Sequence, residues 1–284
     1  MRVRRINGIL GGTAALALAL TACGTAEVGG GNGGGEGDGG EGGGDTITIG
    51  VKYDQPGLGL LENDAPVGLD VDVATYIAGE LGYEPDQIEW TEAASANREA
   101  FLQQGTVDMV VATYSITDER REVVDFAGPY YVAEQDILTR ADEEEIQGPE
   151  DLAGRVLCSA SGSRSAFNIT EERGIDAELR EAGNYSECLS LLGNGAVDAV
   201  TTDNTILAGY AAQNPGTYRV VNNSFGEERY GVGLPEGSTE LCEEINAAIA
   251  KMWEEGYTLE ALETHFGDTD FAYAETAPEA DACE

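Results

Sequence analysis

Positive charge is scarce in this sequence. Its 284 residues include 15 lysines and arginines against 53 aspartates and glutamates, which gives a formal net charge of −38 at pH 7. A surface this acidic repels nucleic acid and anionic lipid, so neither is expected as a binding partner. The acidity itself is better explained by solubility outside the cell, or in high salt, than by a ligand. A place where several of the few cations gather would therefore be informative.

Histidine is rarer still. The only one, His265, falls in an apolar helical repeat near the end of the chain, where we expect an ordinary helix position rather than a ligand or a catalyst. The cysteines match no zinc-binding spacing. We therefore expect no metal and no other cofactor.

The N-terminal segment indicates export. A basic start, Met1 to Arg5, is followed by an Ala/Leu-rich stretch too short for a comfortable membrane span, so residues 1–22 are expected to be a secretory signal. The small residue before Cys23 resembles the lipobox of bacterial lipoproteins, in which that cysteine becomes the lipidated first residue. Residues 23–45 would then be the lipidated cysteine and a Gly-rich tether on the extracellular face of the membrane. A plain secretory signal is the alternative.

Four cysteines remain after Cys23, and an even number in an exported protein suggests disulfides. We favour Cys158–Cys188, because these residues fall at a strand end and at a helix start in one region. Cys242–Cys283 would tie down the C-terminal tail. Loop geometry cannot be judged from the sequence, so other connectivities stay open.

Strand-like and helix-like segments alternate along the chain, which favours an α/β fold with parallel strands. A short pattern occurs twice: Leu102-x-x-Gly105-x-Val107-Asp108-x-Val110 returns as Leu192-x-x-Gly195-x-Val197-Asp198-x-Val200. Both copies predict a helix, a glycine stop and a buried strand. We interpret them as two lobes of similar build, although one short repeat can arise by chance. Lobe 1 would comprise residues 46–136 and 232–284, and lobe 2 residues 139–230.

The stretch from Val107 to Tyr131 carries the most specific signal. An apolar run at residues 107–112 predicts a buried strand, and Thr117 can cap a short helix that follows it. Arg120 falls one turn into that helix, so its guanidinium can reach back toward the Ser115 hydroxyl and free backbone N–H groups. A planar cation beside a hydroxyl and free amides is a good receptor for a carboxylate.

This stretch resembles the signature of the family-3, polar-amino-acid solute-binding proteins of ABC importers. The matching residues are Thr117, Arg120 and the aromatic segment Phe126-x-x-Pro129-Tyr130-Tyr131. The resemblance implies a two-lobed periplasmic-binding-protein-like (type II) clamshell with two hinge crossings. It also implies a monomer that delivers its ligand to a membrane permease.

The resemblance is strongest to glutamate- and aspartate-binding members, and it assigns roles residue by residue. Arg120 would hold the α-carboxylate with help from Ser115 and the helix start at Ser163, Arg164 and Ser165, and Asp203 would hold the α-ammonium. The element Ser95-Ala96-Asn97-Arg98, together with Lys52, would face the side-chain carboxylate. Thr113 matches a position that contributes hydroxyl and backbone contacts. Tyr185 stands where some relatives have histidine, which leaves its role open.

A count of charges supports an acidic ligand. Lys52, Arg98 and Arg120 opposite Asp203 provide three cations and one anion for the two carboxylates and one ammonium of glutamate. A neutral amino acid would leave two enclosed cations without partners, and breaking one buried pair costs roughly 3–5 kcal/mol, a factor of at least about a hundred. L-Glutamate or L-aspartate is therefore expected, and we favour glutamate.

Three other functions are alternatives to glutamate binding. The same fold could bind glutamine, asparagine or another polar amino acid. It could instead be a cyclohexadienyl-dehydratase-like enzyme, but His265 is remote and the cysteines look paired, so no acid–base pair or activated nucleophile is apparent. A receptor's sensing module would continue into a membrane or signalling segment. We therefore expect a binding protein and not an enzyme.

Overall fold

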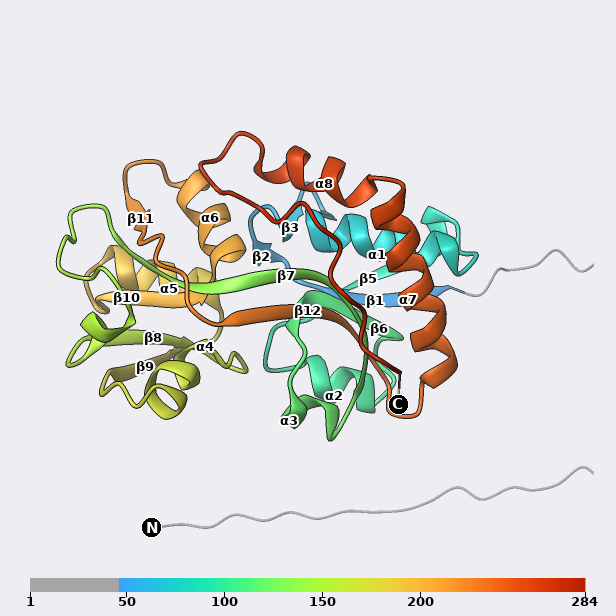
Figure 1. Ribbon diagram of the computed structural model, residues 1–284, viewed down its shortest axis with the longest axis horizontal. Helices are drawn as coiled ribbons and strands as arrows, with labels where there is room; N and C mark the ends of the chain where they lie inside the picture. Colours follow the sequence, from blue (N-terminus) through green and yellow to red (C-terminus); the bar gives the residue numbers. More distant parts are fainter. Residues whose placement is uncertain (1–45, 284) are drawn as a thin grey trace, which may run out of the picture. The chain divides into compact units, whose positions relative to one another are not determined.

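The computed structural model describes residues 46–283 (Figure 1). The expected signal peptide, the lipidation at Cys23 and the Gly-rich tether lie outside these residues. Within residues 46–283, no helix is both long enough and apolar enough to cross a membrane.

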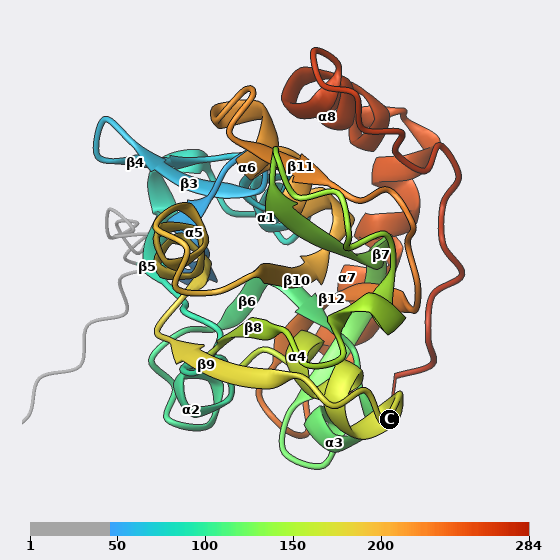
Figure 2. The same cartoon turned by 90° about the vertical axis from the view of Figure 1, so that its left-hand side faces the viewer.

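Each lobe contains a small parallel sheet. In the first lobe β1 (Ile47–Val51) lies between β5 (Ile88–Glu92) and β6 (Met109–Ser115). In the second, seen end-on in Figure 2, β8 (Val156–Ala160) lies between β9 (Glu178–Ala182) and β10 (Ala199–Asp203). Because parallel strands end at the same edge, each lobe presents its strand ends, and the loops after them, as one surface.

Two long antiparallel strands connect the lobes, so the complete sheet is mixed rather than purely parallel. They are β7 (Asp125–Arg140) and β12 (Glu227–Leu234), which run side by side in Figure 1. The first part of β7 pairs with β12, and β12 also pairs with β6. The last part of β7 pairs with β10 and with β11 (Tyr218–Val220). These strands are the two hinge crossings of a two-lobed clamshell.

Helices cover the sheets. The α-helices of the first lobe are α1 (Leu69–Glu80), α2 (Arg98–Gln103), α3 (Asp118–Arg121), α7 (Thr239–Glu254) and α8 (Tyr257–Phe266). Those of the second are α4 (Ser165–Phe167), which continues as a π-helix at Asn168–Glu172, α5 (Tyr185–Gly193) and α6 (Asn204–Gln213). Short 3₁₀ turns lie at Pro85–Gln87 and Pro149–Leu152. The strands β2 (Asp54–Gln55), β3 (Gly59–Glu62) and β4 (Ala65–Val67) form a separate sheet.

The repeated sequence pattern folds as expected. Its copies form α2 followed by β6 and α5 followed by β10, and both strands are buried along their whole length. Gly105 and Gly195 end the turns with φ of +64° and +77°, a backbone conformation that glycine adopts without the cost of a Cβ. The two copies therefore deliver the polar ends of β6 and β10 to the edges where the lobes meet.

Both expected disulfides are present. Cys158–Cys188 joins β8 to α5 within the second lobe, and Cys242–Cys283 joins α7 to the C-terminal segment. That segment passes along the hinge strands, where Asp281 pairs with Arg121 and Arg229 at 2.7 Å each. The tail is thereby fixed to the first lobe and to β12.

Candidate functional site

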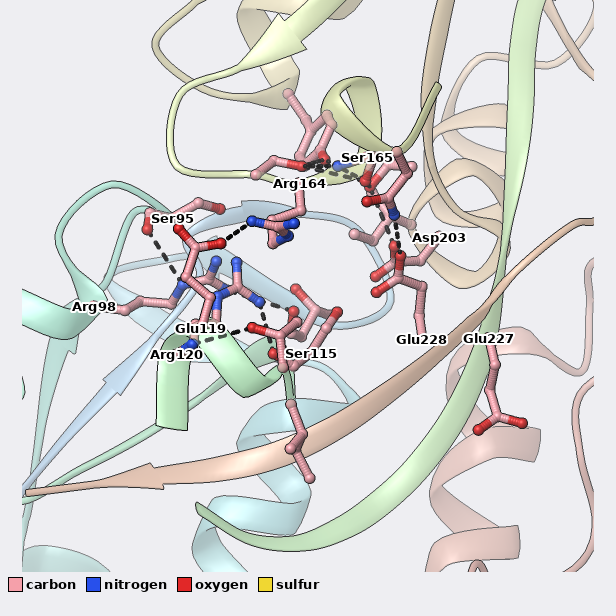
Figure 3. Close-up of a pocket in the computed structure, with 18 of the residues that line it drawn as sticks. Ser95, Arg98, Ser115, Glu119, Arg120, Arg164, Ser165, Asp203, Glu227 and Glu228 are labelled. Carbon is pink, nitrogen blue, oxygen red and sulfur yellow. Dashed lines mark hydrogen bonds and ion pairs between the residues drawn. The ribbon is translucent and has the colours of Figure 1, made fainter. Parts of the chain in front are cut away.

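A cavity of about 450 Å³ lies between the lobes, where the loops after β6, β8 and β10 converge. This volume suits a small molecule. Figure 3 shows its polar groups separated by charge, with Arg98 and Arg120 on one side and Asp203 and Glu228 on the other. Its lining includes all but one of the predicted ligand-binding residues, the exception being Lys52: Ser95, Arg98, Thr113, Ser115, Arg120, Ser163, Arg164, Ser165, Tyr185 and Asp203.

Arg120 lies at one wall of the cavity, on α3. The Thr117 side chain caps this helix as expected, accepting a hydrogen bond from the Arg120 backbone N–H at 3.2 Å. The guanidinium donates to the Ser115 backbone carbonyl at 2.7 Å, and not to the hydroxyl that the sequence suggested. Glu99, whose side chain keeps 29% of its surface exposed, is 3.4 Å away. The guanidinium is thus held in a fixed orientation.

Arg98 is more deeply buried, with 2% of its surface exposed. Its guanidinium donates to the backbone carbonyls of Ala112 at 3.0 Å and Thr113 at 3.4 Å, and its centre lies 4.2 Å above the Tyr114 ring. Burial and the neighbouring Arg120 lower the pKa of Arg98 to about 10, so it remains charged at neutral pH. Asn97 is the N-cap residue of α2, but its side chain makes no capping bond.

Lys52 lies behind the cavity and not at its surface. Its ammonium donates to the Ser95 hydroxyl at 2.6 Å, and Ser95 is the residue of this pair that lines the cavity. Burial, followed by repulsion from Arg98, lowers the pKa of Lys52 to about 7. Near neutral pH this lysine can therefore gain or lose its proton at little cost in free energy. The position of Lys52 in the sequence did not reveal this lowered pKa.

Thr113 adopts a strained backbone conformation at the end of β6. Its φ is +44°, which a β-branched residue rarely adopts. The turn directs its N–H to the Asp70 carboxylate at 2.8 Å, and its hydroxyl donates to Gln55 at 2.9 Å. Tyr130 also donates to Asp70, at 2.7 Å. Sequence reasoning missed both Gln55 and Asp70, because their partners are more than forty residues away.

Hydroxyl groups form the wall contributed by the second lobe. Ser163 Oγ lies 2.6 Å from the Tyr185 hydroxyl, and Ser165 Oγ lies 3.4 Å from Thr202 Oγ1. Ser163 lies just before α4, Ser165 and Tyr185 are the first residues of α4 and α5, and Thr202 lies near the end of β10. The network gives Tyr185 a definite position, buried against the serines of the α4 start.

Arg164 differs from the other predicted site residues. It forms an ion pair with Glu119 of the first lobe, another with Glu172 at 3.4 Å, and lies 4.4 Å above the Phe167 ring. Its charge is therefore committed to Glu119 and Glu172, two largely exposed residues of the cavity lining. The side chain joins the two lobes and does not point freely at a ligand.

Asp203 lies opposite the arginines, at the end of β10. It has 4% of its surface exposed and accepts a hydrogen bond from the Tyr230 hydroxyl at 2.6 Å. Burial, followed by repulsion from Glu228, raises the pKa of Asp203 to about 8. Glu228 on β12 was missed by sequence reasoning, since nothing distinguishes it from the many other acidic residues of the chain.

Gly162 brings the lobes into direct contact. Its carbonyl accepts hydrogen bonds from Arg120 at 3.2 Å and from Arg98 at 3.4 Å. Its φ is +75°, and a Cβ there would lie 2.4 Å from the Ala96 backbone nitrogen. The second lobe can approach the two arginines this closely only because residue 162 has no side chain.

Fold and site together define a two-lobed solute-binding protein: two α/β lobes, two hinge strands, and a small polar cavity between the strand ends. Residues 47–268 match the bacterial extracellular solute-binding proteins, family 3, and the chain belongs to this family.

Relatives of this chain are named for amino-acid binding. It is 41% identical to the glutamate-binding protein GluB of Corynebacterium glutamicum, over 96% of this chain and 94% of that protein. It is 36% identical to the glutamine-binding protein GlnH of Bacillus subtilis, over 75% and 78% of the two chains. Among solved structures, an ancestral arginine-binding protein bound to arginine is similar at a TM-score of 0.72, with 33% identity over 78% of this chain and 98% of the other.

Proposed function

We propose that this protein captures L-glutamate between its lobes, accepts L-aspartate less well, and delivers the amino acid to an ABC permease. The supporting observation is the charge of the enclosed site. Arg98 and Arg120, with Lys52 behind them, lie opposite Asp203 and Glu228, which makes three potential cations and two potential anions. Glutamate adds one net negative charge, which brings this set to neutrality.

The polar groups of the cavity form three sets, one suited to each charged group of glutamate. Arg120, fixed by Ser115, suits the α-carboxylate, and Asp203 across the cavity suits the α-ammonium. Arg98 and Ser95, with Lys52 behind them, suit the side-chain carboxylate. The similarity to GluB supports the same choice of ligand.

Glutamine is the second candidate, and one observation favours it. Because the pKa of Lys52 is about 7, the site can reach neutrality with an uncharged ligand by releasing the Lys52 proton. The similarity to GlnH of Bacillus subtilis points the same way. The relatives compared above are named for binding amino acids and not for turnover, so the enzyme alternative gains no support from them.

Calorimetric titration with glutamate, aspartate, glutamine and asparagine tests the proposal. Glutamate should bind roughly ten- to a hundredfold more tightly than glutamine, because a hydrogen bond to a charged group contributes about 1.5–3 kcal/mol. Aspartate should be weaker than glutamate by about 1–3 kcal/mol, the contribution of one methylene. Equal or tighter binding of glutamine would overturn the choice of ligand, and binding of none of the four would overturn the function.

Substitution of Gly162 should hinder closure of the lobes. The new methyl group of Gly162→Ala would clash with the Ala96 backbone, so the closed form should become a minor state. If one molecule in ten can close, the glutamate affinity measured by calorimetry falls about tenfold. Gly154→Ala is the matched control, because Gly154 also has positive φ, +74°, but no atom within 4 Å of its Cβ position. Equal losses in both variants would contradict this role of Gly162.

We also propose that Cys23 anchors the protein at the extracellular face of the membrane. The lipobox-like residues before Cys23 support this location. Mass spectrometry of the mature N-terminus tests it, and an unmodified Cys23 would exclude the anchor.

A further inference from the structure

Glu228 is a buried acid in the cavity lining that enters the charge count above but has not been matched to any group of the ligand. It lies on hinge strand β12, two residues before Tyr230, with 9% of its surface exposed. Figure 3 shows its carboxyl group on the same side of the cavity as Asp203, opposite the two arginines. The neighbouring Glu227 also lines the cavity, but Figure 3 shows its carboxyl group apart from those of Asp203 and Glu228, and its side chain keeps 65% of its surface exposed.

Neither buried carboxyl group has a close cationic partner. Among residues 46–283, the ion pairs around the cavity join Arg120 to Glu99 and Arg164 to Glu119 and Glu172. Asp203 receives the Tyr230 hydroxyl at 2.6 Å, and Glu228 receives the Asn168 amide at 3.5 Å. Two buried acids supported mainly by neutral donors are poorly stabilised when both are ionised.

Some polar and charged groups around Asp203 and Glu228 favour the ionised carboxylates, and others oppose them. Asp203 is favoured in its ionised form by Arg98 and Arg120 but repelled by Glu228. Glu228 is favoured by Ser115, Arg120 and Arg164 and repelled by Glu172. Burial outweighs these attractions and raises the pKa of both carboxyl groups, that of Asp203 to about 8.

We propose that Glu228 and Asp203 together form a two-carboxylate receptor for the α-ammonium of the ligand, and that they share one proton when no ligand is bound. The inference builds on the proposed function, since the ammonium is that of the captured amino acid. On binding, the carboxylic O–H bond breaks, the shared proton passes to solvent, and the intact –NH₃⁺ takes its place between two carboxylates. Glu228 would thus determine how ligand affinity depends on pH.

The direction of the pH effect follows from this exchange. Below pH 8 the empty site retains its proton, which the ammonium must displace, so affinity should rise with pH and level off near pH 8. One linked proton limits the slope to about tenfold per pH unit. Lys52 and Asp70 also have pKa values near 7 and face the site region, so the Glu228 contribution has to be measured as a difference between variants.

The test is calorimetry of glutamate binding from pH 6 to pH 8, in buffers of different ionisation enthalpy, for the wild type, Glu228→Gln and Glu227→Gln. The buffer dependence gives the number of protons released. At pH 7 we expect Glu228→Gln to release nearly one proton fewer than the wild type, and its loss of affinity to grow as the pH rises. Glu227→Gln removes the same formal charge one position away and should behave as the wild type.

The possible results separate the inference from the proposed function. If the wild type and Glu228→Gln bind glutamate with the same proton release and the same pH slope, the shared-proton site is wrong although the function stands. If the wild type binds none of the four amino acids, the function itself fails. Circular dichroism checks folding, and Glu228→Ala repeats the comparison should the glutamine variant unfold.

Discussion

Arg120→Ala should nearly abolish glutamate binding. Arg120 is the cation that the fold holds in place for the α-carboxylate, through the Thr117 cap and the Ser115 carbonyl. Truncating one member of a buried charge pair costs about 2–5 kcal/mol or more, roughly thirty- to several-thousand-fold in affinity. Isothermal calorimetry at neutral pH should show either a very weak or an undetectable glutamate interaction.

A neighbouring arginine provides the control for this prediction. Arg121 follows directly on the same helix, but it pairs with Asp281 at 2.7 Å, away from the cavity. Arg121→Ala should therefore retain wild-type affinity. Arg120→Lys keeps the charge but loses the planar pair of donors, so its affinity should fall between the wild type and the alanine variant. Near-normal binding by Arg120→Ala would show that the α-carboxylate is held elsewhere.

The local sequence pattern was enough to predict the strand and the helix that bring Arg120 to the site. Thr117 and Arg120 fall within one helical turn, and the buried strand before them is continuous in sequence. The glycine stops at Gly105 and Gly195 likewise depend only on local backbone conformation. Such features are encoded within about ten residues, so they can be predicted without knowing what packs against them.

Features that depend on distant partners could not be predicted this way. Arg164 looked like a ligand-facing cation at a helix start, but its partner Glu119 lies 45 positions earlier, on the other lobe. Glu228 is buried only because β12 runs beside β7. The antiparallel direction of both hinge strands also depends on how the lobes connect, which explains why parallel sheets alone were expected.

Burial also changes the charge argument made from the sequence. Counting Lys52 as a fixed cation implied that a neutral ligand would leave two cations unpaired. In the structure the pKa of Lys52 is about 7, and Arg98 is already hydrogen-bonded to backbone carbonyls. The expected preference for glutamate over glutamine is therefore smaller, and it depends chiefly on Arg98.

Arg98→Ala should weaken glutamate binding far more than glutamine binding. The two ligands share their α groups, so glutamine serves as the internal control that the rest of the site is intact. Loss of the buried cation should cost glutamate about 2–5 kcal/mol, roughly thirty- to several-thousand-fold. Glutamine, which brings no side-chain charge to this end of the cavity, should lose much less, so the preference should reverse in a side-by-side titration.

The protonation state of Lys52 determines how much glutamate affinity the Arg98→Ala variant loses. Repulsion from Arg98 contributes to its lowered pKa, so removing Arg98 should raise the Lys52 pKa and leave this lysine more fully protonated. It can then partly replace the missing charge through Ser95, so the glutamate affinity of Arg98→Ala should partly recover as pH falls through this raised pKa, which lies above 7. Adding Lys52→Met should remove that recovery. Undiminished glutamate affinity in the double variant would show that neither cation recognises the side-chain carboxylate, and the acidic ligand would lose its physical basis.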